Sequence, residues 1–295
     1  MDIRPRRSVL YMPGANARAL EKARALPADA LILDLEDAVA PEAKSEARER
    51  VAEAVKAKNF GHREVVIRIN AMDTGWAIAD IEAAVAAGPD AILIPKVSRP
   101  GDIASVAKIL AARLAPPETR LWAMMETPAA ILNAREIAAA ASDPSNRLSC
   151  LVLGTNDLLK ETRARADAER FAAIPWLATC VLAARAHGLD VLDGVYNDFK
   201  NEAGFRAECE QGRSLGMDGK TLIHPAQIAP CNDIFSPSQE EVEWSQKIIA
   251  AFEQPENAGR GVITIDGRMV ERLHLAMARR AVAITDAIAK LAEAA

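Results

Sequence analysis

Eight short apolar runs recur along the chain, and most of them end in a charged or polar cluster. Between consecutive runs lies an Ala-rich stretch in which apolar residues recur at helical spacing. Strand alternating with helix, repeated eight times, predicts an α/β fold of the (β/α)8, or TIM barrel, type. The runs occupy residues 8–12, 30–33, 65–69, 91–94, 121–125, 151–153, 191–192 and 221–223.

The intervening helices are expected at residues 15–26, 41–58, 76–87, 101–114, 128–141, 175–187 and 201–215. The strand ends on one face of such a barrel build its active site. Polar residues that directly follow the apolar runs are therefore the first candidates for chemistry.

About 60 residues follow the eighth run. Residues 237–252 have a helical pattern, residues 262–270 predict a small hairpin around Asp266-Gly267, and residues 273–292 predict an amphipathic helix. We therefore expect a barrel over residues 1–235 and a C-terminal extension over 236–295. The extension could cover the mouth of its own barrel or that of a neighbouring subunit.

Composition and charge argue against a nucleic-acid partner, a membrane span and secretion. The net charge of the 295-residue chain is −5, without the long block of like charge typical of nucleic-acid binding. Residues 1–7 lack the apolar core of a secretory signal, and no run approaches the ~20 apolar residues of a membrane span. Four widely spaced cysteines without a CxxC pair indicate reduced thiols in a cytoplasmic protein.

Glu126 and Asp157 form the sharpest candidate pair. Each follows one of two consecutive apolar runs, so both carboxylates are expected at neighbouring positions on the same rim. Two carboxylates, water and a bidentate substrate suit Mg²⁺, which prefers six oxygen ligands; Mn²⁺ accepts the same oxygens. Alternatively, either acid could cap the helix that follows it.

Arg68 interrupts an otherwise apolar strand and needs an anionic partner there. That partner could be a substrate carboxylate or enolate oxygen, or a fixed ion pair with Glu36 or Asp37. These two acids could also hydrogen-bond to metal-bound water or orient Arg68.

Two further features invite weaker hypotheses. Lys96 ends the fourth run and suggests a Schiff-base aldolase, although a structural ion pair is the favoured interpretation. The turn that contains Pro13 and Gly14 leads into a helix whose start could receive a phosphate. The basic residues near this turn are Arg7, Arg18 and Lys22.

Several runs together resemble the citrate lyase β-subunit-like family of CoA-ester lyases, within the larger HpcH/HpaI aldolase group. They are RSVLYMPG (7–14), LDLEDAV (33–39), RIN (68–70) and MET (125–127). The resemblance implies a TIM barrel that binds Mg²⁺ and acts on short acyl-CoA thioesters. It also implies a homo-oligomer, often a trimer or hexamer, in which the C-terminal segment reaches a neighbouring subunit.

By this resemblance Glu126 and Asp157 match the family's metal ligands. Arg68 matches the arginine that binds substrate and steadies the enolate. Besides Arg68 and Glu126, we expect Gly154, Thr155 and Asn156 to contact the substrate. The possible contacts to its coenzyme A part are Arg7, Pro13, Gly14, Arg18 and Lys22.

Three other runs are similar to the (3S)-malyl-CoA thioesterase branch: GTNDL (154–158), HGLDVLDGVYN (187–197) and DGKTLIHP (218–225). Lyase members carry an aspartate in the C-terminal hairpin motif, thought to donate a proton across the subunit boundary. At the matching position this chain has Glu271. The extra methylene matters because a displacement of about 1 Å can cost ~100-fold in rate.

The hypothesis is therefore Mg²⁺-dependent hydrolysis of (3S)-malyl-CoA to malate and CoA, with Glu271 orienting or deprotonating the attacking water. The alternative is carbon–carbon cleavage of malyl-CoA, citramalyl-CoA or citryl thioesters. Because Arg68, Glu126 and Asp157 are all present, we do not expect a subunit that works only with an acyl-carrier partner.

Overall fold

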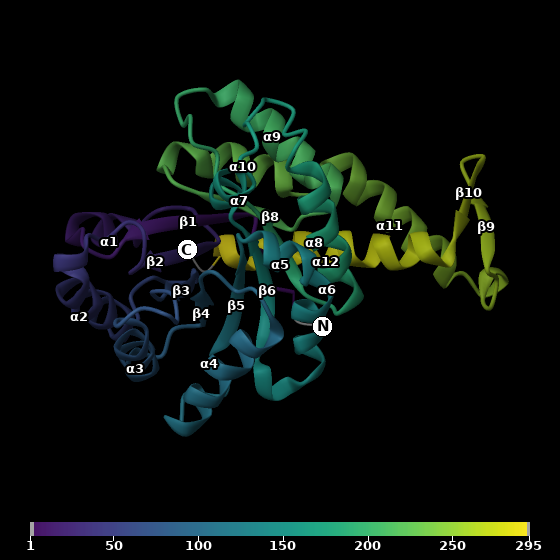
Figure 1. The fold of residues 1–295 in the computed structure, drawn as a ribbon. Helices are drawn as coiled ribbons and strands as arrows, with labels where there is room; N and C mark the ends of the chain where they lie inside the picture. Colours follow the sequence, from purple (N-terminus) through teal and green to yellow (C-terminus); the bar gives the residue numbers. More distant parts are fainter. Residues whose placement is uncertain (1–2, 294–295) are drawn as a thin grey trace. The chain divides into compact units, whose positions relative to one another are not determined.

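The computed structural model describes residues 3–293 and shows a closed barrel of eight parallel strands in sequential order (Figure 1). This confirms the barrel predicted from the apolar runs. The strands are β1 (Ser8–Pro13), β2 (Ala30–Asp34), β3 (Glu64–Arg68), β4 (Ala91–Ile94), β5 (Arg120–Met125), β6 (Leu148–Leu153), β7 (Asp190–Asp193) and β8 (Gly219–Leu222).

The barrel interior is filled by apolar side chains. Successive residues of a strand point to opposite faces, so alternate positions form the interior. These inward-facing residues are Val9, Ala30, Ile32, Val66, Ala91, Leu93, Trp122, Met124, Cys150, Val152 and Leu192. The positions between them, such as Leu31 and Ile67, belong to a second cluster that packs against the helices. The strands are therefore buried on both faces, as expected for a parallel sheet.

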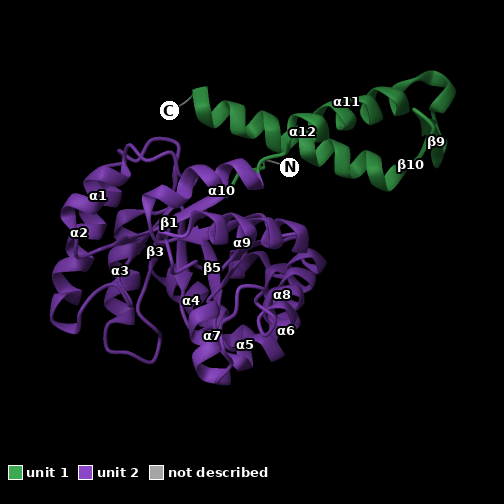
Figure 2. Cartoon of the chain, turned by 90° about the horizontal axis from the view of Figure 1, so that it is seen from above, with its two compact units in different colours: residues 1–5, 236–295 green, residues 6–235 purple. Residues whose placement is uncertain are grey.

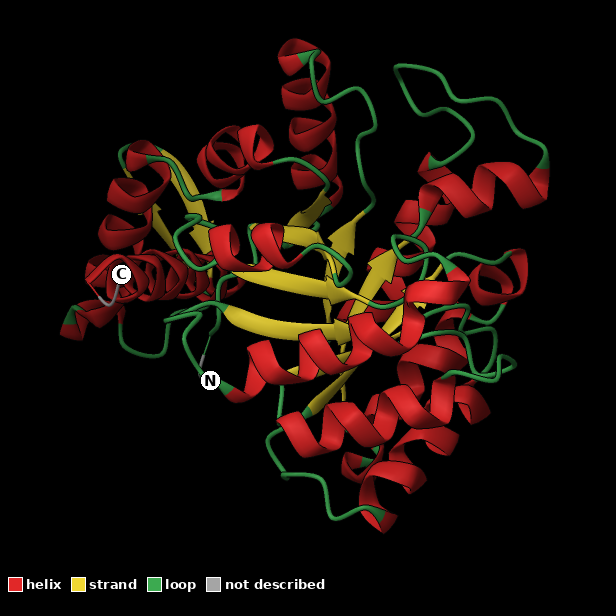
Figure 3. Ribbon diagram, turned by 90° about the vertical axis from the view of Figure 1, so that its left-hand side faces the viewer, coloured by secondary structure: helices red, strands yellow, loops and turns green. Residues whose placement is uncertain are grey.

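Helices surround the strands (Figure 3). In the barrel they are α1 (Ala17–Ala23), α2 (Lys44–Lys56), α3 (Ala77–Ala87), α4 (Pro100–Ala112), α5 (Pro128–Leu132), α6 (Ala134–Ala139), α7 (Thr155–Thr162), α8 (Ile174–Ala186), α9 (Glu202–Leu215) and α10 (Ile228–Phe235). Within residues 3–293, none of the helices combines the length and the apolarity that a membrane crossing requires.

Three helical features differ from the sequence-based expectation. The predicted helix at 128–141 is interrupted at Asn133, whose side-chain amide donates to the Ser98 carbonyl at 2.8 Å. Helix α7 was not predicted, because its sequence TNDLLKET reads as a polar loop. Helix α10 was also not predicted; its Pro230 falls in the first turn, where a missing N–H is tolerated.

The chain divides into two compact units, residues 6–235 and residues 1–5 with 236–295 (Figure 2). The smaller unit contains α11 (Gln239–Glu253), the hairpin β9 (Val262–Ile265) and β10 (Arg268–Glu271), and α12 (Arg272–Glu293). Asp266 and Gly267 both have positive φ, of 48° and 76°. A two-residue Asp-Gly turn requires this geometry, so the predicted hairpin is confirmed.

The smaller unit has an apolar cluster of its own. Side chains from both long helices and from both strands of the hairpin meet in it. The cluster consists of Ile248, Phe252, Ile263, Val270, Leu275 and Ala278. This packing explains why the C-terminal segment forms regular structure rather than a loose tail.

A buried network of charges joins β7 and β8 to the outer layer. Asp193 accepts hydrogen bonds from Arg170 Nη1 with both oxygens, at 2.8 Å each, and from Lys220 Nζ at 2.9 Å. Lys220 Nζ also donates to Glu208 Oε1 at 2.5 Å. Burial alone would raise the pKa of Asp193, but the charges of Lys220 and Arg170 lower it below the usual range. The carboxylate is therefore held ionised inside the fold.

Asp193→Asn should destabilise the protein by about 3–5 kcal/mol, because two buried cations lose their shared anion. Asp233→Asn is the matched control: Asp233 pairs with Arg206 but its side chain is 65% exposed, so the loss should stay below about 1 kcal/mol. Denaturant unfolding measures both changes. Equal effects of the two substitutions would contradict a structural role for the buried network.

Candidate active site at the C-terminal end of the barrel

Strand register places Asp34 beside Arg68. The two residues are paired between β2 and β3, and each continues the inward-facing series of its strand, after Ile32 and Val66. Arg68 donates from Nε to Asp34 Oδ1 at 2.6 Å and from Nη2 to Oδ2 at 2.7 Å. Pairing through two hydrogen bonds fixes the orientation of the guanidinium plane as well as the position of its charge.

The remaining edge of the Arg68 guanidinium faces the two acids that the sequence analysis singled out. Nη1 lies 3.0 Å from Glu36 Oε2 and 3.4 Å from Asp37 Oδ2. Burial raises the pKa of Glu36 to about 8, against the opposing effect of the Arg68 charge. The principal partner of Arg68 is nevertheless Asp34, which the sequence analysis did not select. Strand alternation was the missed signal, because only Asp34 of the three acids ends a strand on its inward face.

Tyr11 was also missed. Its ring lies against the Arg68 guanidinium, with Cζ 4.9 Å from the ring centroid, and its hydroxyl contacts Met124 Sδ at 3.5 Å. An aromatic face favours a cation in this position. Burial raises the pKa of Tyr11 well above the usual range, so the phenol stays neutral.

Glu126 is held rigidly at the end of β5. Its side chain is only 1% exposed, and it follows the inward-facing Met124 by two positions. Oε1 accepts the backbone N–H of Lys96 at 2.7 Å, whereas Oε2 is buried and forms no hydrogen bond with any residue from 3 to 293. Burial raises the pKa of Glu126 to about 7, although the Lys96 charge opposes the shift. Glu126 Oε2 is therefore available to bind a cation.

Asp157 approaches the same point from the first turn of α7. The Lys96 ammonium lies 3.7 Å from Glu126 Oε1 and 3.7 Å from Asp157 Oδ1. Two oxygens that flank one nitrogen in this way are separated by no more than twice that distance. The structure thus places the two predicted carboxylates around one ammonium, that of Lys96.

The ion pairs of Lys96 with Glu126 and Asp157 argue against the Schiff-base hypothesis. Burial alone would lower the pKa of Lys96, but Glu126 and Asp157 raise it above the usual value. A Schiff-base nucleophile must be a neutral amine. The geometry therefore favours a charge-pairing role for Lys96, as expected from its sequence context.

Neither acid caps a helix. Thr127 caps α5, where its hydroxyl accepts from the Ala130 N–H at 3.0 Å. Gly154 occupies the cap position of α7, and Asp157 lies inside the helix. The capping alternative for Glu126 and Asp157 is therefore wrong, which leaves both carboxylates available to a ligand.

Gly154 packs directly against Glu126. A Cβ at this position would lie 2.4 Å from Glu126 Cβ and 2.8 Å from Oε2. The Gly154 N–H donates to the Met125 carbonyl at 3.1 Å, which continues the register of β5 and β6. Only glycine leaves room for the carboxylate in its observed place.

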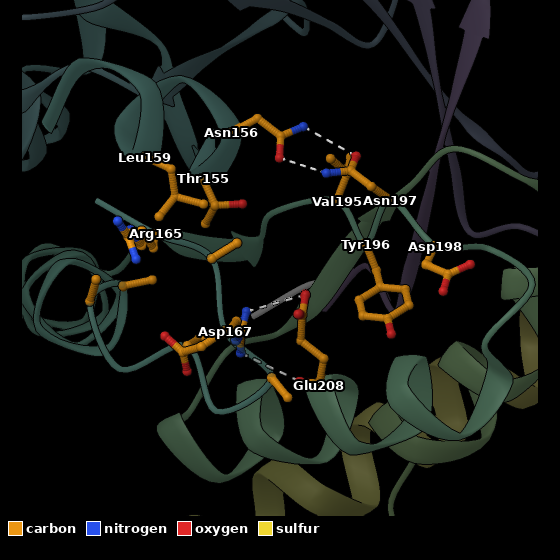
Figure 4. A pocket seen from close by; sticks show the side chains of 15 residues that line it. Thr155, Asn156, Leu159, Arg165, Asp167, Val195, Tyr196, Asn197, Asp198 and Glu208 are labelled. Atoms are coloured by element: carbon orange, nitrogen blue, oxygen red, sulfur yellow. Dashed lines mark hydrogen bonds and ion pairs between the residues drawn. The ribbon is translucent and has the colours of Figure 1, made fainter. Parts of the chain in front are cut away.

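A pocket of about 330 Å³ opens beside the start of α7 (Figure 4). Thr155 and Asn156, two predicted substrate contacts, line it. Asn156 and Asn197 bond to each other through both side-chain amides, at 3.2 and 2.8 Å, along one side of the pocket. Arg165 lies on the opposite side of the opening, in the loop that follows α7 (Figure 4).

The basic residues proposed to contact coenzyme A do not gather in one place. Pro13 and Gly14 lie at the C-terminal end of β1, where the Gly14 N–H donates to the Asp34 carbonyl at 2.9 Å. Arg18 and Lys22 are exposed on α1. Arg7 precedes β1, at the opposite end of the barrel, and its Nε and Nη2 bind Asp29 at 2.8 and 2.7 Å.

Glu271 lies at the end of β10 in the smaller unit. Its backbone N–H donates to His274 Nδ1 at 2.9 Å. Its half-buried carboxylate makes no hydrogen bond or ion pair to any residue between 3 and 293.

The residues present fit a hard divalent cation. In the described chain no cluster of three or more His, Cys, Asp or Glu side chains is placed to hold a metal ion. Mg²⁺, however, is commonly bound through one or two carboxylates, with water and substrate supplying its other oxygens. The unpartnered Glu126 Oε2 and the ammonium between the two acids are what such a site requires.

Comparisons with known proteins identify relatives of this chain. Residues 7–225 match the HpcH/HpaI aldolase/citrate lyase family. The chain is 53% identical to a (3S)-malyl-CoA thioesterase of Cereibacter sphaeroides over 97% of this chain and 96% of that protein. It is 36% identical to citrate lyase subunit beta of Escherichia coli, over 91% and 89%.

A solved structure of protein CitE from Mycobacterium tuberculosis, in complex with magnesium, acetoacetate and coenzyme A, superposes with a TM-score of 0.75. It is 28% identical to this chain and covers 94% of it, and the match spans 96% of that protein's chain.

Gly154→Ala should lower the free energy of unfolding by about 1–3 kcal/mol, because the added methyl group forces Glu126 from its place. Gly101→Ala in α4 is the control, since nothing lies within 4 Å of a Cβ at Gly101. Thermal or denaturant unfolding of both variants checks this. If Gly154→Ala were as stable as Gly101→Ala, the close packing around Glu126 would be refuted.

Proposed function

This chain belongs to the HpcH/HpaI aldolase/citrate lyase family, and we propose that it is a Mg²⁺-dependent enzyme that hydrolyses (3S)-malyl-CoA to malate and CoA. The observation that carries the proposal is that Glu126 and Asp157 both contact the Lys96 ammonium, at the end of the barrel where Arg68 is held. The 53% identity to a (3S)-malyl-CoA thioesterase supports the choice of substrate and reaction.

Glu126 and Asp157 would hold the ion, which Mn²⁺ could replace. When bound, it supplies positive charge that orients the 3-hydroxy acid end of the substrate and neutralises its oxygens. The N–H groups of the first turn of α7 lack carbonyl partners within the helix. Thr155 and Asn156 therefore present backbone donors to a carboxylate bound between β6 and α7, and Gly154, whose N–H bonds to the Met125 carbonyl, would contact it without donating.

Arg68 stabilises the oxyanion that develops when water attacks the thioester carbonyl. Asp34 fixes its plane, so little reorganisation is needed as the charge forms. A donor fixed in this way is often worth ~3–4 kcal/mol in the transition state. Glu36 and Asp37 hold the same guanidinium from the other side.

Glu271 would orient or deprotonate the attacking water. Its carboxylate has no competing partner in the described structure, which leaves it free for this task. We propose that the chain forms a homo-oligomer, a trimer or hexamer, in which the extension from residue 236 onward reaches the barrel of a neighbouring subunit.

The acyl-CoA would lie across the rim of the barrel. The pocket beside α7 contains Thr155 and Asn156, so we assign part of the acyl-CoA to it. Pro13, Gly14, Arg18 and Lys22 remain candidates for contacts to the CoA moiety, whereas the Arg7 guanidinium is committed to Asp29. The four cysteines are buried and unpaired, in keeping with a proposed cytoplasmic location.

Carbon–carbon cleavage is the second candidate reaction. The 36% identity to citrate lyase subunit beta favours it, and it would use the same metal ligands and Arg68. The products distinguish the reactions: malate and free CoA report hydrolysis, whereas glyoxylate and acetyl-CoA report cleavage.

Purified protein should convert (3S)-malyl-CoA to malate and free CoA in the presence of Mg²⁺, and a chelator should abolish the reaction. Glu126→Gln and Asp157→Asn should lose it as well, because each removes a metal-binding charge. Glu161→Gln, at an exposed position of the same helix as Asp157, should retain it. Mass spectrometry of the products provides the readout; acetyl-CoA and glyoxylate as sole products would overturn the thioesterase assignment.

Glu271→Gln should reduce kcat for hydrolysis roughly 10²–10⁴-fold, the usual contribution of a general base. Glu271→Asp should raise the share of acetyl-CoA among the products. Glu253→Gln, at an exposed position of α11 in the same unit, serves as the control. A Glu271→Gln enzyme that hydrolyses malyl-CoA at the original rate would remove Glu271 from the mechanism.

A further inference from the structure

Lys96 contacts both proposed metal ligands. It follows β4 and Pro95, and its backbone N–H already bonds to Glu126 Oε1 at 2.7 Å. The side chain then brings Nζ to 3.7 Å from both Glu126 Oε1 and Asp157 Oδ1. The ammonium therefore lies beside both carboxylates that we propose as metal ligands.

The local backbone is arranged to make this contact. Lys96 has a φ of +54°, in the left-handed region that residues with a side chain seldom adopt. Strain of this kind is often found where the surrounding structure positions a functional group. Here it directs both the N–H and the ammonium of one residue toward the same carboxylate.

The exposed fraction differs among the three charged side chains and is largest for Lys96. The Glu126 side chain is 1% exposed and Asp157 26%, whereas the Lys96 side chain is 40% exposed. Glu126 is buried in the rim and Asp157 lies in the first turn of α7, but the ammonium reaches both from the solvent side on a flexible stem. Lys96 can leave the site without any movement of the ligands.

Further acidic side chains influence Lys96. After Glu126 and Asp157, the acids that act on Lys96 through their charge are Glu36 and Asp37. Asp37 is 63% exposed and interacts only weakly with Arg68, at 3.4 Å. A cation that leaves the two ligands would therefore still have a negative neighbour.

We propose that Lys96 is the internal counter-ion of the metal site: its ammonium neutralises Glu126 and Asp157 in the metal-free protein and is displaced toward solvent when a divalent ion binds. This inference rests on the proposed function, because it takes Glu126 and Asp157 as the metal ligands. It adds that Mg²⁺ binds in competition with a side chain of the same protein. Lys96 thus sets the apparent affinity of the site and protects the metal-free fold.

Neutralising Lys96 tests the competition. Lys96→Met keeps the length and apolar stem but removes the charge, so Mg²⁺ should bind at least ~10-fold more tightly by calorimetry, without any substrate. The metal-free variant should unfold at a lower temperature than the parent, and Mg²⁺ should restore more of its stability. Lys96→Arg retains the charge and should bind Mg²⁺ much as the parent does.

Lys160→Met is the matched control, since Lys160 is an exposed lysine on α7, the helix that carries Asp157. It should change the affinity for Mg²⁺ less than about 2-fold. Equal or weaker Mg²⁺ binding by Lys96→Met would overturn the counter-ion role while leaving the metal site intact. Failure of the parent protein and all variants to bind Mg²⁺ would overturn both this inference and the proposed function.

A measurement on the unaltered protein gives an independent test. Lysines can be labelled with an amine-reactive acetylating reagent and quantified by peptide mass spectrometry. Mg²⁺ should increase labelling of Lys96 several-fold, and a chelator should reverse the increase, whereas labelling of Lys160 should stay constant. Unchanged or decreased labelling of Lys96 in Mg²⁺ would contradict its displacement.

Discussion

A carboxylate buried away from water needs a positive partner, and the rest of the site depends on how this need is met for Glu126. Its side chain is 1% exposed, and among the described residues none forms a hydrogen bond with its Oε2. An isolated buried charge is costly unless it is paired or takes up a proton. Burial accordingly raises the pKa of Glu126 to about 7. A proton, the Lys96 ammonium and a divalent ion are three ways of meeting the same demand, and only the last combines it with substrate binding.

The barrel creates this situation by simple geometry. Because side chains alternate along a strand, Asp34, Arg68 and Glu126 lie on the inward face. Each follows the last inward-facing apolar residue of its strand by two positions. Each charged group then rests on a rigid strand end. Groups held on such elements lose little freedom when a ligand arrives. The Arg68–Asp34 pair and the Glu126 carboxylate are consequently in place before any substrate binds.

Much of this could be predicted from the sequence, because buried parallel strands give apolar runs that are easy to recognise. The carboxylates that follow two such runs, Glu126 and Asp157, meet in the structure at one ammonium. The predicted partners of Arg68 were Glu36 and Asp37, which was wrong for the principal ion pair. Residue type alone does not distinguish the acids between positions 34 and 37. Register and strand alternation do, and they select Asp34.

Other features depend on contacts that a sequence does not encode locally. The two-sided contact of Lys96 arises from three separate elements, and the fit of Gly154 against Glu126 arises from adjacent strands. The most direct test of the central claim is a crystal structure of the protein soaked with Mn²⁺, examined by anomalous scattering. The account predicts one strong peak within bonding distance of both Glu126 and Asp157. A peak elsewhere on the barrel, or none at these two carboxylates, would contradict it.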